Sequence, residues 1–127
     1  MGGLLEREHS LRRIKEVLTQ PKIWRWQGQN DKDAFIPNPS FIYFKVGEGL
    51  IFYEPNGDHV YLHTAIVDLP EKPIQGLLAN FEQIKEMGYK KVYAYIDFGH
   101  HRACFMARAA GMERQEFENG NLFMRAL

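Results

Sequence analysis

The chain has 127 residues, with 16 basic and 16 acidic side chains that give a formal net charge of zero at pH 7. A neutral chain lacks the broad positive field that attracts nucleic acid or an anionic membrane, so we expect neither partner. The length suits one domain. We expect residues 1–127 to form a single unit, with a helix and a loop over residues 1–40 and the sheet core over residues 41–127.

The single cysteine, Cys104, excludes an intrachain disulfide and favours a reducing compartment. The N-terminus carries Glu6, Arg7 and Glu8 where a secretory signal would be apolar, and no run of about 18 apolar residues occurs. We therefore expect a cytoplasmic protein without a membrane segment. Because no base adjoins Cys104 in the sequence, we expect its thiol to be buried as a small apolar group.

The first predicted element is a helix that Ser10 caps and Pro21 stops. Its apolar positions recur at helical spacing and are Leu11, Ile14, Val17 and Leu18. Residues 27–39 show no pattern and predict a loop. Trp24 and Trp26 precede it, and we expect them to anchor the helix to the sheet, with part of an acceptor pocket as the alternative.

Three strands are predicted next, over residues 41–46, 50–54 and 59–69. The sequence Gly47-Glu48-Gly49 predicts the first hairpin turn. The second turn is expected over residues 55–58 with Asn56-Gly57 at its centre, because both residues tolerate positive φ. Together the three segments predict an antiparallel meander.

The apolar spacing then becomes helical over residues 73–87, between Pro73 and Gly88, which suit the first turn and the end of a helix. A strand over residues 91–96 and a helix over residues 101–110 follow, and Gly111 ends that helix. The helix is expected to bury Ala103, Met106, Ala107 and Ala110. A final hairpin pairs residues 113–117 with 122–125 around Asn119-Gly120.

One helix joins the strands at 59–69 and 91–96, so these strands should be parallel within a mixed sheet. The start of that helix offers free amides and a positive dipole end, which suit an anion. The candidate amides are those of Gln75, Gly76, Leu77 and Leu78. The alternative is that this is an ordinary crossover helix whose end binds nothing.

Three segments resemble the GNAT superfamily of N-acetyltransferases, and most closely the small GNAT-like proteins of tailed phages. Residues 60–71 (VYLHTAIVDLPE) look like the family's central strand and its Pro-Glu turn, and phage-type members often have a histidine where His63 stands. Residues 87–92 (MGYKKV) are similar to the entry into the next strand. Arg102-Ala103 with Ala110-Gly111-Met112 resembles the family's last helix.

This resemblance implies a GNAT-like acyl-CoA N-acyltransferase fold, α/β, whose mixed sheet splays in a V between its two parallel strands. It implies acetyl-CoA as the cofactor, bound in the V. The backbone of the central strand, Thr64, Ala65, Ile66 and Val67, would hold the pantetheine and polarise the acyl carbonyl. The pyrophosphate would lie on the amides of Gln75, Gly76, Leu77 and Leu78, with His100 close to the cofactor.

Several positions depart from the family's pattern. The pyrophosphate loop matches only at Gly76, because Pro73 and Leu78 stand where the family has Arg or Gln and Gly or Ala. Ala107 occupies the position of a tyrosine that protonates the leaving thiolate. Tyr93 and Tyr95, on a strand that lines the family's cleft, are expected to pack with wet hydroxyls, with replacement of that acid as the alternative.

His63 is the candidate general base, because an imidazole titrates near the pH at which an amine must lose its proton. Strand alternation places it on the face of Tyr61, Ala65 and Val67. A packed structural histidine is the alternative. His100 and His101 lie near Asp97, but they lack the spacing of a zinc motif, so no metal site is expected.

Two functions remain open at this point. The first is an acetyl-CoA-dependent N-acetyltransferase with His63 as base and a small-molecule or protein amine as acceptor. The second is a catalytically inactive GNAT-fold protein that acts in phage virion assembly or DNA delivery through protein contacts, in the host cytoplasm or the virion. No strand is evident before Ser10, so the open edge of the sheet suggests a homodimer or a hetero-complex.

Overall fold

The computed structural model describes residues 4–21, 37–66, 73–96, 101–115 and 121–127. Its strands form one mixed sheet in the order β1-β2-β3-β4-β6-β5, and the only parallel pair in that described sheet is β3 with β4. The strands are β1 (Ile42–Val46), β2 (Gly49–Asn56), β3 (His59–Ala65), β4 (Lys91–Ile96), β5 (Glu113–Gln115) and β6 (Asn121–Ala126). The predicted α/β class and the parallel pair are confirmed.

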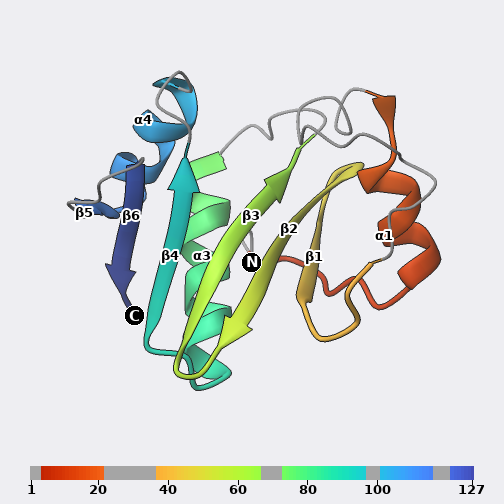
Figure 1. Ribbon diagram of the computed structural model, residues 1–127, viewed down its shortest axis with the longest axis horizontal. Helices are drawn as coiled ribbons and strands as arrows, with labels where there is room; N and C mark the ends of the chain where they lie inside the picture. The colour runs from red at the N-terminus through yellow and green to blue at the C-terminus, as the bar shows by residue number, and fades with distance from the viewer. Residues whose placement is uncertain (1–3, 22–36, 67–72, 97–100, 116–120) are drawn as a thin grey trace.

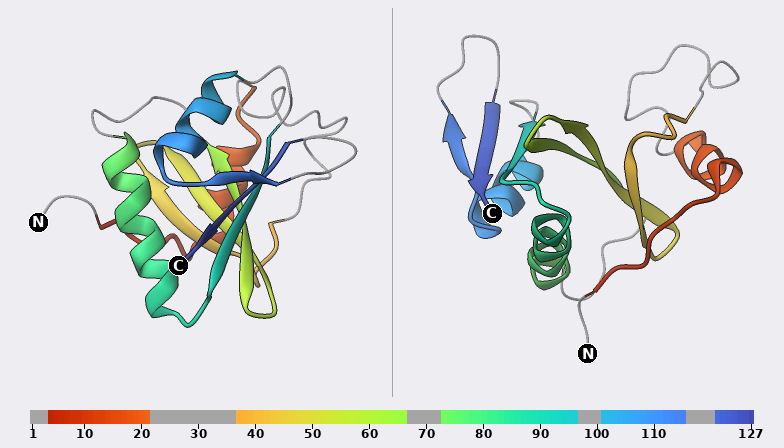
Figure 2. Two further views of the ribbon diagram at one scale, coloured as in Figure 1. Left: turned by 90° about the vertical axis from the view of Figure 1, so that its left-hand side faces the viewer. Right: turned by 90° about the horizontal axis from the view of Figure 1, so that it is seen from below.

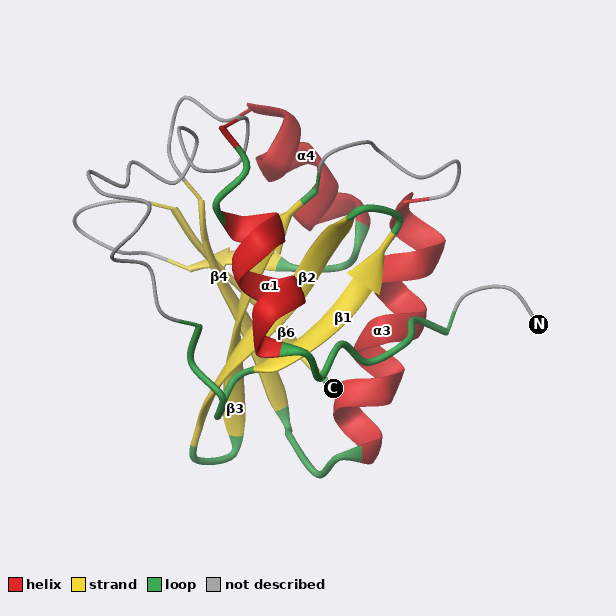
Figure 3. Ribbon diagram, turned by 90° about the vertical axis from the view of Figure 1, so that its right-hand side faces the viewer, coloured by secondary structure: helices red, strands yellow, loops and turns green. Residues whose placement is uncertain are grey.

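Three described helices cover the sheet from both sides. Helices α3 (Pro73–Glu86) and α4 (His101–Ala109) lie on one face, behind the sheet in Figure 1. Helix α1 (Leu11–Leu18) packs on the opposite face, near β1 and β2 (Figures 2 and 3). In Figure 1 no described helix lies in front of β3 and β4, so the front of this part of the sheet is free of a helical layer.

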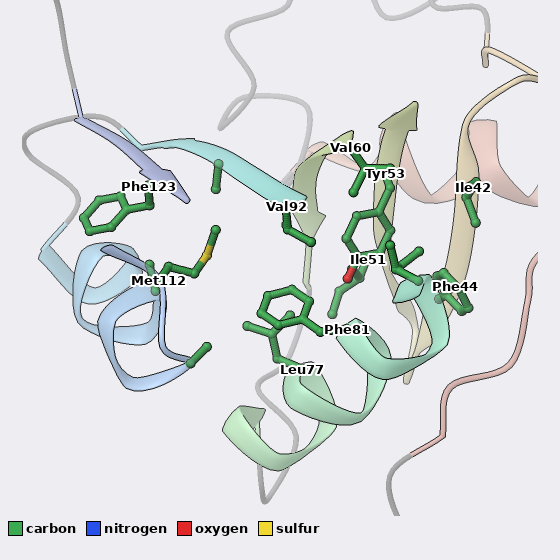
Figure 4. Packing of buried hydrophobic residues seen from close by; sticks show 14 of the residues in the cluster. Ile42, Phe44, Ile51, Tyr53, Val60, Leu77, Phe81, Val92, Met112 and Phe123 are labelled. Carbon is green, nitrogen blue, oxygen red and sulfur yellow. The ribbon is translucent and has the colours of Figure 1, made fainter. Parts of the chain in front are cut away.

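Strand alternation divides the buried residues into two cores. Phe44, Tyr53 and Val60 point toward α3, where they meet Phe81 and Leu77 (Figure 4). The neighbouring strand positions point the other way. They form a smaller core with α1 that consists of Ile14, Val17, Leu18, Tyr43, Leu50, Phe52 and Ala65. Both faces of β1 and β2 are therefore buried, which fixes these strands as a platform for β3.

Both tight hairpins depend on a glycine at the first loop position. The pairs Val46–Gly49 and Asn56–His59 leave two-residue loops in which Gly47 and Gly57 have φ values of 58° and 64°. A positive φ at the first loop residue is the type II′ geometry that matches the twist of a hairpin. The predicted turn centred on Asn56-Gly57 is therefore wrong by one residue, because Asn56 remains in β2.

The helix boundaries agree with the predicted signals. The Ser10 hydroxyl accepts a hydrogen bond from the Arg13 amide at 3.2 Å, and Gly111 follows α4 with a φ of 82°. Two details of the predicted stripes are wrong. Leu11 is exposed on α1, and on α4 Cys104 is buried whereas Ala103 and Met106 are only half-buried. The predicted burial of Cys104 is confirmed.

The N-terminal segment, residues 6–8, lies along the outer edge of β1. The Glu8 amide donates to the Tyr43 carbonyl at 2.9 Å, and the Lys45 amide donates to the Glu6 carbonyl at 2.8 Å. Lys45 also holds the buried Glu8 carboxylate, with Nζ 3.7 Å from Oε2. The expected open edge is therefore covered from within the chain, which removes the argument that a partner must complete the sheet.

A buried polar network joins this N-terminal segment to α3 and β2. The Tyr53 hydroxyl donates to Asn80 Oδ1 at 2.6 Å, and Asn80 Nδ2 donates to Gln83 Oε1 at 3.0 Å. The Gln83 side chain then accepts from the Leu5 amide and donates to the Leu5 carbonyl. Each of the side chains in this network, Tyr53, Asn80 and Gln83, has a hydrogen-bond partner, as buried polar groups require.

Removing the Tyr53 hydroxyl should therefore destabilise the fold. Tyr53→Phe leaves Asn80 Oδ1 buried without its donor, and we expect a loss of about 1 to 3 kcal/mol in the free energy of unfolding, measured by urea denaturation. Tyr89→Phe, at a partly buried tyrosine beside the same core, is the control and should lose less. Equal losses in the two variants would contradict the assigned role of the network.

Candidate active site

The parallel ladder between β3 and β4 ends early. Its pairs are His59–Lys91, Val60–Val92 and Tyr61–Tyr93, and the described residues form no further pairs between the two strands. Beyond these pairs β3 continues to Ala65 and β4 to Ile96. Figure 1 shows the two strands close together at the lower end and diverging toward the upper end. The predicted V-shaped splay is present.

The splay leaves backbone groups of β3 without a strand partner. On its other side, β3 pairs with β2 over its whole length, from His59 to Ala65. Along a strand, successive residues direct their N–H and C=O groups to opposite neighbours. Alternate residues between Leu62 and Ala65 therefore direct these groups toward the V, where β4 has moved away. A bound molecule with amide groups could pair with them as an additional strand would.

Helix α3 begins near the open end of the V (Figure 1). Its first residue is Pro73, which has no N–H, so the amides of its first turn that lack a partner within the helix are those of Ile74 and Gln75, at the positive end of the helix dipole. A Cβ added at Gly76 would meet nothing within 4 Å, so its backbone is open to approach. Leu77 is buried in the larger core and Leu78 packs partly against it. Both lie beyond the first turn of α3, so their amides bond to carbonyls within the helix, and the prediction that they hold a pyrophosphate is wrong.

His63 lies beside the V, two residues beyond Tyr61, the last residue of β3 that pairs with β4. Its ring stacks on Phe52, with centroids 5.0 Å apart, and on Phe41 at 6.4 Å. This packing removes water from the imidazole, which lowers the pKa of His63 below its ordinary value, while the nearby Glu54 carboxylate opposes the shift. The side chain is still 44% exposed, so an incoming molecule can reach it. At neutral pH the imidazole is neutral and can accept a proton.

Glu54 is a site residue that the sequence analysis did not single out. Its Oε2 lies 3.6 Å from His63 Nε2, close enough to form an ion pair once the imidazole is protonated. The contact is diagonal, because Glu54 is opposite Tyr61 and Phe52 is opposite His63 in the β2–β3 ladder. A register derived from the correct hairpin loop would have found it.

Tyrosine rings continue this face of the sheet across the V. The centroid of the Tyr61 ring lies 5.7 Å from that of Tyr93 and 5.9 Å from that of Tyr95. The planes of the Tyr61 and Tyr95 rings differ by 13°. His59 contacts both Tyr61 and Tyr93 edge-on. Tyr95 is 59% exposed. We call Tyr61, Tyr93 and Tyr95 the tyrosine surface.

The other predicted site residues fall into two groups. Thr64, Ala65 and Ile66 lie on or directly after β3 beside the V, and their role in binding the pantetheine stays a prediction. Val67 and His100 lie outside the described residues, as do Trp24, Trp26 and Asp97, so their predicted roles stay predictions. Ala107 is buried in the larger core, and no acidic side chain takes its place on the described part of α4.

The described residues contain no cluster of three His, Cys, Asp or Glu side chains arranged to hold a metal ion. Among the described helices, none is long and apolar enough to cross a membrane. At this site the described residues offer open backbone groups, a helix N-terminus, and the pair formed by His63 and Glu54.

Solved structures share this fold. The aminoglycoside acetyltransferase AAC(6')-Ib in complex with coenzyme A superposes with a TM-score of 0.65 at 16% identity, over 96% of this chain and 92% of that chain. The PaiA N-acetyltransferase of Thermoplasma acidophilum, in complex with coenzyme A, gives a TM-score of 0.63 at 12% identity, over 94% of this chain and 96% of that one. A probable GNAT-family acetyltransferase of Chromobacterium violaceum gives 0.65 at 13%, over 96% and 81%.

These similarities establish the fold as that of the GNAT acetyltransferases, in agreement with the sequence analysis. No protein-family model matches the sequence, and no curated protein matches it. The closer similarity to phage-encoded proteins gains no support from these neighbours. At identities of 12–16% the shared geometry concerns the backbone, so each side chain of the site must be judged by its own contacts.

The electrostatics of His63 can be tested directly. In an NMR pH titration we expect the pKa of His63 to lie below the ordinary value of about 6.5. Glu54→Gln removes the charge that favours the imidazolium, so the pKa should fall further. Asp58→Asn, which alters the carboxylate beside His59, is the control and should leave His63 unchanged. A His63 pKa at or above 6.5 in the unmodified protein would contradict the assignment.

Proposed function

We propose that the chain is an acyl-CoA-dependent N-acyltransferase that transfers an acetyl group to an amine. One observation carries the proposal: the β3–β4 ladder ends after Tyr61–Tyr93, and α3 begins near the gap that opens. A slot with free backbone groups and an anion-binding helix end suits a ligand that combines an extended amide arm with a pyrophosphate. The neighbours solved with coenzyme A support this choice of ligand.

The described residues fit coenzyme A through backbone groups. Open backbone groups between Leu62 and Ala65 suit the pantetheine amides, and the amides near Gly76 suit the pyrophosphate. Leu78, which stands where the family has Gly or Ala, is partly buried against the larger core. Pro73 lacks an amide, and the first turn of α3 carries no acidic or basic side chain. Binding therefore depends on the helix end more than on side-chain charge.

When bound, acetyl-CoA supplies the thioester: the amine nitrogen forms a bond to the carbonyl carbon, the carbon–sulfur bond breaks, and coenzyme A leaves as its thiol. His63 accepts the proton that the amine must lose, and its lowered pKa keeps the ring ready for this at neutral pH. The Glu54 carboxylate, 3.6 Å from Nε2, then stabilises the imidazolium. His63 lies on β3 beyond its last pair with β4, and Glu54 lies on the neighbouring strand β2.

The thiolate must also gain a proton. Ala107, at the position where the family has its acid, is buried and has no proton to give. Tyr61 is one of the described hydroxyl groups beside the V: partial burial, followed by the neighbouring Tyr95, Tyr93 and Glu54, raises its pKa. We assign this proton to solvent rather than to Tyr61, because the pKa of Tyr61 is raised rather than lowered.

The second candidate is a catalytically inactive protein with the GNAT fold. The resemblance to phage proteins suggested a role in virion assembly for it. The absence of a side-chain acid at Ala107 and of an amide at Pro73 favours it. The β1 edge argues against this candidate. It was the main surface expected to need a protein partner, and residues 6–8 of the same chain cover it. The two candidates differ in one measurable property, the affinity for coenzyme A.

Acetyl-CoA should stabilise the protein against heat. At about 100 times its dissociation constant a ligand adds about 2.7 kcal/mol, which corresponds to a rise in Tm of roughly 10 °C for a chain of this length. Gln75→Glu places a negative charge at the α3 N-terminus and should reduce this rise. Gln115→Glu, the same change on β5, is the control and should keep it. No shift at millimolar acetyl-CoA would leave the inactive candidate in place.

His63→Gln should lower kcat/KM by about a hundredfold, because the ring that accepts the amine proton is lost. Thiol release from acetyl-CoA with a panel of primary amines measures the rate, and the thermal shift with acetyl-CoA should stay as in the unmodified protein. His9→Gln, at an exposed histidine on the N-terminal segment, is the control. Loss of both turnover and the thermal shift would show that His63 is structural.

A further inference from the structure

The tyrosine surface lies on the face of the sheet opposite α3 and α4. Register places Tyr61 opposite both Tyr93 and Glu54, and the ring contacts show that the three tyrosines share one face. Helix α1 packs on this face only near Tyr43, Leu50, Phe52 and Ala65. The rings therefore lie beyond the part of the face that α1 covers, and Tyr95 is 59% exposed.

This surface has a charge pattern of its own. Glu54 lies beside both Tyr61 and His63, and it is about half exposed. At the other end, Lys91 is opposite His59 and is exposed. The Glu54 carboxylate favours a cation near His63. At the other end the charge of Lys91 is opposed by the Asp58 carboxylate, which lies 3.3 Å from His59 Nδ1. The pattern thus places the attraction for a positive charge at Glu54.

We propose that the tyrosine surface and Glu54 bind the acceptor as a primary amine that carries an aromatic ring. The proposal rests on the proposed function and names its acceptor class. The ring would pack on Tyr61 and Tyr95, since aromatic faces attract one another in offset arrangements. The ammonium would lie between Glu54 and His63, where the imidazole takes its proton before attack.

Strand geometry limits the length of this molecule. Tyr61 and His63 are two residues apart on one face of β3, so their side chains leave the strand about 6.6 to 6.8 Å apart. A linker of two or three carbons between the ring and the nitrogen spans that separation. 2-Phenylethylamine is therefore the probe of choice. n-Hexylamine lacks the ring, and 2-phenylethanol lacks the charge.

The test is a titration of the full chain with each probe, followed by NMR of the His63 and tyrosine ring signals, with and without 1 mM coenzyme A. We expect 2-phenylethylamine to shift the signals of Tyr61, Tyr95 and His63. Its Kd should be about fivefold lower than that of n-hexylamine, because one aromatic contact is worth about 1 kcal/mol. The alcohol should bind more weakly than the amine.

Variants assign the binding to this surface. Tyr95→Leu should raise the Kd about fivefold, and Glu54→Gln should raise it about threefold. The controls are Phe105→Leu, at an exposed aromatic residue on α4, and Glu82→Gln, at an exposed carboxylate on α3, and both should leave the Kd unchanged. Since Tyr95 and Phe105 are both exposed, each leucine variant should fold.

The outcomes separate this proposal from the proposed function. If acetyl-CoA raises Tm but 2-phenylethylamine shifts none of these signals with or without coenzyme A, the acceptor class is wrong and the acyltransferase stands. If the amine binds as expected while acetyl-CoA has no effect, the surface is a ring-amine site and the acyltransferase is wrong. Equal binding of n-hexylamine, or no effect of Tyr95→Leu, overturns the role of the tyrosine surface.

Discussion

The architecture of the candidate site depends on the point at which β3 leaves β4. Each strand has a full antiparallel partner on its outer side, β2 for β3 and β6 for β4, and these ladders run to the ends of both strands. The parallel ladder between them stops at Tyr61 and Tyr93. Because β2 and β6 hold the outer sides, the inner backbone groups become free without unravelling the sheet, which is the condition for a ligand to enter it.

The packing on either face keeps this opening in place. On one face, Phe81 and Leu77 of α3 pack against Val60 and Val92 below the point of divergence (Figure 4). Their contacts hold the strands together where they still pair. The network from Tyr53 through Asn80 and Gln83 fixes α3 to β2 and to the N-terminal segment. Helix α3 therefore has a defined position, and its N-terminus stays near the open end of the V.

The sequence predicted those features that have a local cause. Ser10 and Gly111 end their helices through contacts within one turn, and the change from strand to helical spacing placed α3 to within a residue. The pairing of His63 with Glu54 has a different origin. It depends on the hairpin loop being Gly57-Asp58, whereas a turn centred on Asn56-Gly57 would place Glu54 opposite His59. That shift of two residues keeps each side chain on its face but changes its neighbours.

The tyrosine surface was beyond sequence analysis for a similar reason, since it depends on how a parallel pair is aligned across a helical connection. Tyr61 and Tyr93 are each ordinary strand residues, and only their register makes them adjacent. The edge of β1 shows the opposite case. A segment without a strand pattern, residues 6–8, pairs with the sheet through backbone groups that any residue can supply, so composition gave no sign of it.

The central claim is that the gap between β3 and β4 receives an extended ligand that pairs with the free backbone of β3. Amide hydrogen exchange followed by NMR, with and without coenzyme A, tests it most directly. We expect coenzyme A to slow exchange at amides between Leu62 and Ala65 that face the gap, and at the first amides of α3, those of Ile74 and Gln75. Unchanged exchange at the β3 amides in the presence of saturating coenzyme A would contradict it, even if exchange slowed elsewhere in the chain.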